Sequence, residues 1–173
     1  MSTGESTPTE QSTLPADPVP WPQPNGVYGQ YALHCHCGAV RWNMKLSPPL
    51  LAEETTSNYP ERYTANECLC SYCVRNGHWS TNPFAKDVEW TQGLEHRVLY
   101  WTAGKQNPFW ICGKCHCLLG MDLSAIMEQF GMPEDQKRCT INVRMLKDFD
   151  PAKLQVRQMT MARDMGDPYT VEE

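Results

Sequence analysis

The arrangement of its nine cysteines constrains the fold of this 173-residue chain more than any other feature does. Most of them fall in three short clusters: Cys35 and Cys37, then Cys68, Cys70 and Cys73, then Cys112 and Cys115 with Cys117 just beyond. Cysteines separated by a single residue make poor structural disulfides, and cysteines that merely fill a core would not gather in this way. The clusters therefore indicate metal ligands or reactive thiols.

The rest of the sequence favours a reducing compartment. Residues 1–10 are polar and lack the basic start and apolar run of a secretory signal. No apolar stretch approaches the roughly 20 residues that span a bilayer. We therefore expect a cytoplasmic protein without a membrane partner, in which cysteines serve as ligands rather than disulfides. A net charge of −5 also argues against nucleic acid as a partner, because binding phosphates needs a basic face.

Two of the clusters suit one closed zinc site. A Cys-x-x-Cys knuckle brings two thiolates to one tetrahedral ion, and a Cys-x-Cys on a bend can do the same. Cys35 and Cys37 with Cys112 and Cys115 would complete a four-sulfur site and close a long loop, which predicts a structural zinc.

The middle cluster differs because Cys68, Cys70 and Cys73 offer three ligands and no obvious fourth. Zinc with three protein ligands keeps one coordination position free, as catalytic zinc does. The alternative is that a distant His or Cys completes a second structural site. We expect two zinc ions per chain, one structural and one catalytic.

The predicted fold class is mainly β, with small antiparallel sheets held together by zinc and one short helix. Residues 1–25 contain six of the fourteen prolines and predict an extended arm, which Trp21 could still hold against the domain. Residues 26–155 form the predicted zinc domain and 156–173 a C-terminal tail. Short runs of β-branched and aromatic residues predict strands at 27–33, 39–44, 88–90, 97–102, 109–112, 118–123 and 139–146. The helix is predicted at 124–130, with Ser124 as its N-cap and Gly131 closing it.

Three motifs together resemble the glutathione-dependent formaldehyde-activating enzyme and centromere-protein-V (CENP-V/GFA) family. They are Cys-His-Cys-Gly-Ala-Val-Arg-Trp at 35–42, Cys-x-Cys-x-x-Cys at 68–73 and the late Cys-x-x-Cys at 112–115. The resemblance covers about residues 27–150 and implies a β-tent fold, a structural zinc on the first and last clusters and a catalytic zinc on the middle one. Some members add glutathione to formaldehyde, and many are described as carbon–sulfur lyases. The chain departs from the family's pattern at Leu69, where His is usual, and at His116, where Gly is usual.

Several residues near the middle cluster are further candidates. His78 is a candidate acid–base group or fourth ligand, and Arg75 and Asn76 could bind a substrate carboxylate, although a solvated loop explains them as well. Trp79, Trp101, Phe109 and Trp110 belong to the core or wall an apolar pocket. Cys139 lies in an alternating strand and is expected to be buried, and Cys117 is expected to pack.

The leading expectation for function is a zinc-dependent carbon–sulfur lyase or adduct-forming enzyme that acts on glutathione or another thiol conjugate, with homo-oligomerisation left open. Two alternatives stay open. One is an enzyme like methionine sulfoxide reductase, which would need a reactive thiol at Cys139. The other is a non-enzymatic, zinc-stabilised binding module.

Overall fold

Alternation of apolar and polar residues builds the smaller of two β-sheets. The computed structural model describes residues 21–102 and 106–160. Strands β1 (Gly29–His34), β2 (Arg41–Leu46) and β5 (Val88–Gln92) pair antiparallel in the order β1-β2-β5. In β2 the side chains of Trp42, Met44 and Leu46 are buried and those between them are exposed. One face of this sheet therefore covers the core, and the other faces solvent.

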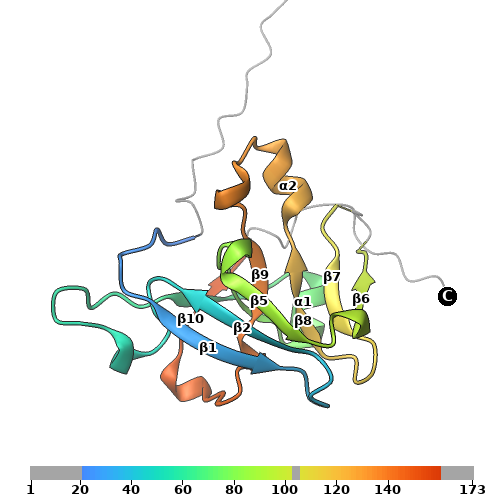
Figure 1. The fold of residues 1–173 in the computed structure, drawn as a ribbon, viewed down its shortest axis with the longest axis horizontal. Helices are drawn as coiled ribbons and strands as arrows, with labels where there is room; N and C mark the ends of the chain where they lie inside the picture. Colours follow the sequence, from blue (N-terminus) through green and yellow to red (C-terminus); the bar gives the residue numbers. More distant parts are fainter. Residues whose placement is uncertain (1–20, 103–105, 161–173) are drawn as a thin grey trace, which may run out of the picture.

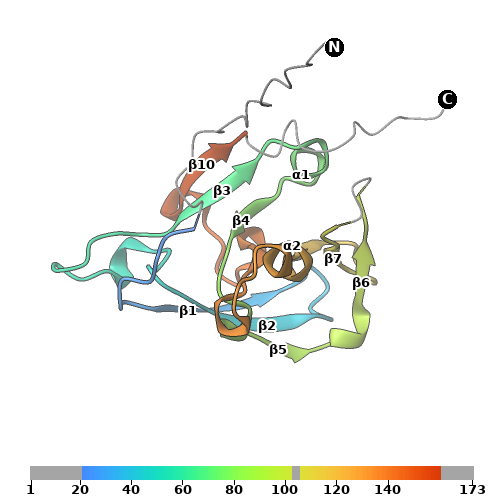
Figure 2. The ribbon, with the colours of Figure 1, turned by 90° about the horizontal axis from the view of Figure 1, so that it is seen from above.

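The larger sheet has seven strands in the order β10-β3-β4-β9-β8-β7-β6. Their bounds are β3 Thr64–Cys68, β4 Trp79–Thr81, β6 Arg97–Tyr100, β7 Phe109–Cys112, β8 Leu118–Asp122, β9 Cys139–Asn142 and β10 Gln155–Met159. Figure 1 shows the two sheets as a ribbon, and Figure 2 shows β1, β2 and β5 on one side of the molecule with β3, β10 and α1 (Ser71–Asn76) on the opposite side. The main core lies between the sheets and contains Leu33, Trp42, Tyr63, Leu119 and Ile141.

Central strands of the larger sheet approach each other very closely. A Cβ placed on Gly120 of β8 would lie 2.0 Å from the carbonyl oxygen of Thr140 on β9. A side chain at this position would push the two strands apart, so only glycine fits here. Strand β9 is buried along its whole length, including Thr140 and Asn142.

The second helix, α2, spans Ser124–Gln129. Ser124 begins the helix rather than capping it: Leu123 occupies the N-cap position, and the Asp122 carboxylate accepts a hydrogen bond from the Ser124 N–H at 2.8 Å. Gly131 does close the helix, with the positive φ of 64° that glycine adopts freely. Short 3-10 turns lie at Ala52–Glu54, Ala85–Asp87, Leu94–His96, Glu134–Gln136, Val143–Met145 and Pro151–Lys153.

The mainly β prediction is confirmed, with differences in detail. A strand lies in each of the seven ranges predicted, but β3, β4, β10 and helix α1 were not predicted. The pair β3–β10 is parallel, so the larger sheet is not purely antiparallel. The predicted strand 139–146 ends at Asn142, because the Asn142 side chain accepts a hydrogen bond from the Arg144 N–H and starts a 3-10 turn.

The boundaries of the structured part also differ from those predicted. Strand β10 carries the larger sheet to Met159, so the structured part continues past residue 155. At the other end, the Trp21 ring lies 5.8 Å from the Arg138 guanidinium, and the Asn25 N–H donates to Ser47 Oγ. The remainder of the predicted arm (1–20) and tail (161–173) lies outside the described residues. Within the described residues, no helix has the length and apolar character needed to cross a membrane.

Candidate metal centres

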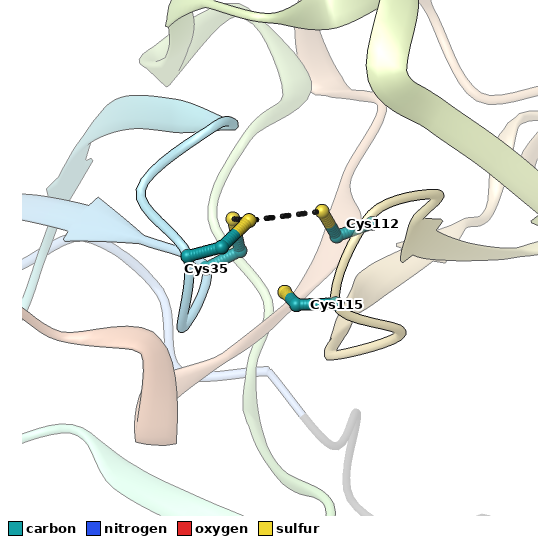
Figure 3. Close-up of side chains that lie close together, drawn as sticks. Cys35, Cys112 and Cys115 are labelled. Carbon is teal, nitrogen blue, oxygen red and sulfur yellow. Dashed lines mark hydrogen bonds between the residues drawn. The ribbon is translucent and has the colours of Figure 1, made fainter.

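Two turns from different sheets bring four cysteines together. Cys35 and Cys37 lie in the turn between β1 and β2, and Cys112 and Cys115 lie at the end of β7 and in the turn that follows. All four sulfurs lie within 4.8 Å of one another; Cys37 Sγ is 3.5 Å from Cys35 Sγ and 3.9 Å from Cys112 Sγ. Figure 3 shows Cys35, Cys112 and Cys115 converging from the two turns. Zinc–sulfur bonds of 2.3 Å in a tetrahedron place sulfurs about 3.8 Å apart, so this cluster fits a zinc ion.

Each turn holds its sulfurs by a similar pattern of backbone hydrogen bonds. The Gly38 N–H donates to the Cys35 carbonyl at 2.9 Å, and the His116 N–H donates to the Cys112 carbonyl at 2.8 Å. In both turns the residue after the second cysteine has a positive φ, 70° at Gly38 and 59° at His116. Glycine adopts this left-handed conformation without a steric penalty, whereas His116 carries a Cβ there.

The surroundings of the four-cysteine cluster favour the charged form of one of its thiols. Burial raises the pKa of Cys112. Burial also opposes ionisation of Cys115, but N–H groups of Cys117 and Cys37 and the thiols of Cys112 and Cys37 outweigh it and lower the Cys115 pKa to about 6. A bound cation would stabilise the other thiolates in the same way.

The cysteines of the second cluster come from one short segment. Cys68 ends β3, Cys70 is the N-cap of α1, and Cys73 lies in its first turn, where its N–H donates to Cys70 Sγ at 3.4 Å. Their sulfurs also lie within 4.8 Å of one another. No other Cys, His, Asp or Glu of residues 21–102 and 106–160 joins them at that spacing. Hydrogen bonds with the thiols of Cys68 and Cys73 lower the pKa of Cys70, whereas hydrogen bonds with the thiols of Cys68 and Cys70 raise that of Cys73.

His78 lies beside this cluster without completing it. The residue is 3 % exposed, and its Nδ1 lies 3.4 Å from Cys73 Sγ. Burial lowers the His78 pKa to about 4, so the ring is neutral at pH 7. A thiolate can only accept a hydrogen bond, which places the proton on Nδ1 when Cys73 is ionised. This geometry suits a group that orients a metal ligand.

The other predicted site residues are not aimed at the three sulfurs. The Arg75 guanidinium donates to the Ser71 carbonyl and the Asn76 amide donates to the Tyr72 carbonyl, so both exposed side chains fold back on α1. Trp79 donates to Glu67, lies under the Arg144 guanidinium at 4.2 Å and packs against the main core.

An aromatic group lies beside the three cysteines, and of its members only Phe109 was a candidate from the sequence. The Phe109 side chain packs in one apolar cluster with Cys68, Cys73 and Leu118, and Tyr72 packs against this cluster. The Tyr72 ring is 4.4 Å from the Phe109 ring and 4.7 Å from the Tyr100 ring. Of the aromatic residues considered from the sequence, Trp110 belongs to the main core and Trp101 is exposed. The position of Tyr72 inside the Cys-x-Cys-x-x-Cys motif was the available signal for it.

The two cysteines outside the clusters are buried or packed against the core, as predicted. Cys139 is 3 % exposed, and burial raises its pKa to about 12. Cys117 is half-buried against the main core, next to Cys115.

These features define the chain as a mainly β protein with two cysteine clusters, one of four and one of three residues, that could each bind a metal ion such as zinc. No protein-family model matches the sequence. A search of curated proteins finds no match either. The chain is similar in structure to a Rhodobacter sphaeroides protein solved by structural genomics, with a TM-score of 0.50 and 21% sequence identity over 73% of this chain and 99% of that one. This similarity concerns the fold.

Proposed function

We propose that the chain is a zinc-dependent enzyme that makes or breaks a carbon–sulfur bond on glutathione or another small thiol or thiol conjugate. The observation that carries this proposal is the difference between the two clusters: four sulfurs converge at one, and three converge at the other without a fourth His, Cys, Asp or Glu among the described residues. The resemblance of the three cysteine motifs to the CENP-V/GFA family supports the same function.

The four-cysteine cluster suits a structural zinc, because it ties the smaller sheet to β7 and leaves no coordination position open. The three-cysteine cluster suits a catalytic zinc. An ion held there would supply Lewis acidity, softened by three thiolates, toward a sulfur or carbonyl oxygen at its fourth position.

The chain's own residues would hold the metal-binding cysteines in position for the reaction. The N–H of Cys73 supports Cys70, and neutral His78 supports Cys73, so both ligands are held in place before a substrate arrives. In the addition of a thiolate to an aldehyde, the new C–S bond forms as the C=O π bond opens, and the oxygen takes up a proton from water. The reverse reaction releases the thiol and the carbonyl compound. Neither direction needs a strong base from the protein.

Burial of Cys139 disfavours the redox alternative. A sulfoxide-reducing thiol must reach its substrate and ionise near neutral pH. Cys139 is 3 % exposed and its pKa is raised to about 12, so it meets neither requirement.

The test combines metal analysis with an activity panel. The zinc-loaded protein is incubated with glutathione plus formaldehyde, and separately with alkyl and aryl glutathione conjugates, while thiol loss or release is followed. Activity on either set should disappear in Cys70→Ala and persist in Cys139→Ala. Absence of turnover on both sets, together with no effect of glutathione on the metal at the three-cysteine site, would instead favour the binding-module alternative.

A further inference from the structure

The three-cysteine cluster continues into an aromatic surface that reaches solvent. Tyr72, which lies between two of the ligands in the sequence, stacks on Tyr100 with an angle of 15° between the ring planes. The Phe109 ring lies at 43° to that of Tyr72, and its other neighbour is the His78 ring at 6.1 Å. A continuous series of rings therefore runs from the neighbourhood of Cys73 outward to Tyr100.

Strand pairing places the rings on one face of the larger sheet. Tyr100 of β6 is paired with Phe109 of β7, so both side chains project to the same face. Phe109 and Ile111 belong to the apolar cluster of the three cysteines, whereas the alternate residues Trp110 and Cys112 belong to the main core. The side of β6 that carries Tyr100 is thus the side of the three-cysteine site, and the side that carries Leu99 is the opposite one.

The outer part of this surface is open to solvent. Tyr100 is 39 % exposed, although its ring is packed on one side by Tyr72. An exposed aromatic ring can stack on another flat apolar group. Arg75, the nearest cation in the sequence to the three cysteines, is directed to the helix backbone instead. Among the described residues, the side chains that the structure places beside the three cysteines and toward solvent are thus the aromatic rings of Tyr72 and Tyr100.

From this arrangement we propose that Tyr72, Tyr100 and Phe109 form a subsite that selects thiols carrying an aromatic or other flat apolar group. It rests on the proposed function, since the ligand's sulfur would bind a metal held by Cys68, Cys70 and Cys73. A thiol bound there as thiolate would give its proton to solvent, and its apolar group would lie against the exposed part of these rings. This assigns a specificity role to residues that are not themselves metal ligands.

The test measures binding rather than turnover. Protein loaded with Co²⁺, whose absorption bands change with each added thiolate ligand, is titrated with benzyl mercaptan and with 2-mercaptoethanol, two thiols of similar acidity. The wild-type protein should bind benzyl mercaptan about tenfold more tightly, because the aryl group leaves water. Tyr100→Ala should reduce this preference by about three- to tenfold. Leu99→Ala, a matched change on the opposite face of the same strand, should leave it unchanged.

The possible results separate the two proposals. Equal binding of both thiols by the wild type, or a preference that Tyr100→Ala leaves intact, would overturn the aromatic subsite while preserving the open thiol-binding metal. A preference lost equally in Leu99→Ala would also overturn it. If neither thiol changes the Co²⁺ spectrum, the thiol-binding function fails and the subsite fails with it.

Discussion

The Nδ1 atom of His78 lies 3.4 Å from Cys73 Sγ, inside an apolar environment that Phe109 helps to form. His78 is thereby tied to one of three cysteines, rather than being equidistant from all three as a fourth ligand would be. Such an outer partner fixes the orientation of a metal-bound sulfur and moderates its charge.

Replacing His78 should therefore weaken the three-cysteine site selectively. We expect His78→Ala to lower the zinc affinity of that site by about 10- to 100-fold, because Cys73 loses its hydrogen-bond donor. Competition with a chromophoric chelator measures the loss, with circular dichroism as a check on folding. His96→Gln, a change at a histidine paired with Glu95 near the surface, serves as the control. Unchanged zinc affinity in folded His78→Ala would show that the contact does not support the ligand.

The two clusters should respond differently to loss of one sulfur. Cys112→Ala removes a ligand from the site that joins the two sheets, and structural zinc supplies on the order of 10 kcal/mol in small domains. This is comparable with the whole stability of a domain, so the variant should be insoluble or lack cooperative unfolding. Cys70→Ala should stay folded with one zinc per chain and lose activity. Thermal melts and elemental analysis make the comparison, and the opposite ranking would exchange the roles of the two sites.

Alkaline pH should destabilise the fold partly through Cys139. Its pKa is raised to about 12 by burial, above the value of about 8.5 for an exposed thiol. A raised pKa means that the stabilising contribution is present below the unfolded-state value and is lost as pH rises toward the native one. Burial raises the pKa of Tyr63 to about 12, which adds an effect of the same sign.

Urea unfolding at pH 8, 9 and 10 measures this dependence. The free energy of unfolding should fall by up to about 1.4 kcal/mol per pH unit from Cys139 alone above pH 9. Cys139→Ala should be less stable at pH 8 because of the cavity, but its slope between pH 9 and 10 should be shallower than that of the wild type. Parallel slopes would show that the Cys139 thiol does not titrate differently in the two states.

The left-handed backbone at His116 gives a further prediction. His116→Gly should keep the zinc content and change stability by no more than about 1 kcal/mol, because relief of the strained φ offsets the greater freedom of the unfolded chain. His116→Val should destabilise the protein by about 1–2 kcal/mol, since a β-branched residue tolerates a φ of 59° poorly. Thermal or urea unfolding with a zinc assay distinguishes them. Equal stability of the Gly and Val variants would contradict this account.

The sequence predicted the parts of the fold that depend on local patterns. Alternation in β2 and the aromatic run of β7 identified those strands, and cysteine spacing divided seven sulfurs into the two clusters that the structure brings together. Strand β3 was missed because it buries Asn66, a polar residue whose Oδ1 accepts a hydrogen bond from Arg157 across the sheet. Helix α1 was missed because it has only six residues and its first three belong to the cysteine motif.

The environment of the three-cysteine site could not be predicted from spacing. Tyr100 and Phe109 meet only because β6 pairs with β7, and Tyr72 reaches them only because α1 folds back after β3. Conversely, Arg75 and Asn76 follow Cys73 directly in the sequence, but helix geometry lets their side chains bond to carbonyls one turn earlier. Proximity in sequence was a poor guide for these residues because a helix rotates successive side chains to different sides.

Strand β7 shapes the surroundings of both clusters, with Phe109 and Ile111 on one face and Trp110 and Cys112 on the other. Side chains alternate strictly along a strand, so deletion of a single residue here would exchange the two faces downstream. Such a deletion would turn Cys112 away from its three partner sulfurs and aim a core side chain at the other cluster. Point substitutions can therefore alter either cysteine cluster separately, whereas a change in the length of β7 would disrupt both clusters together.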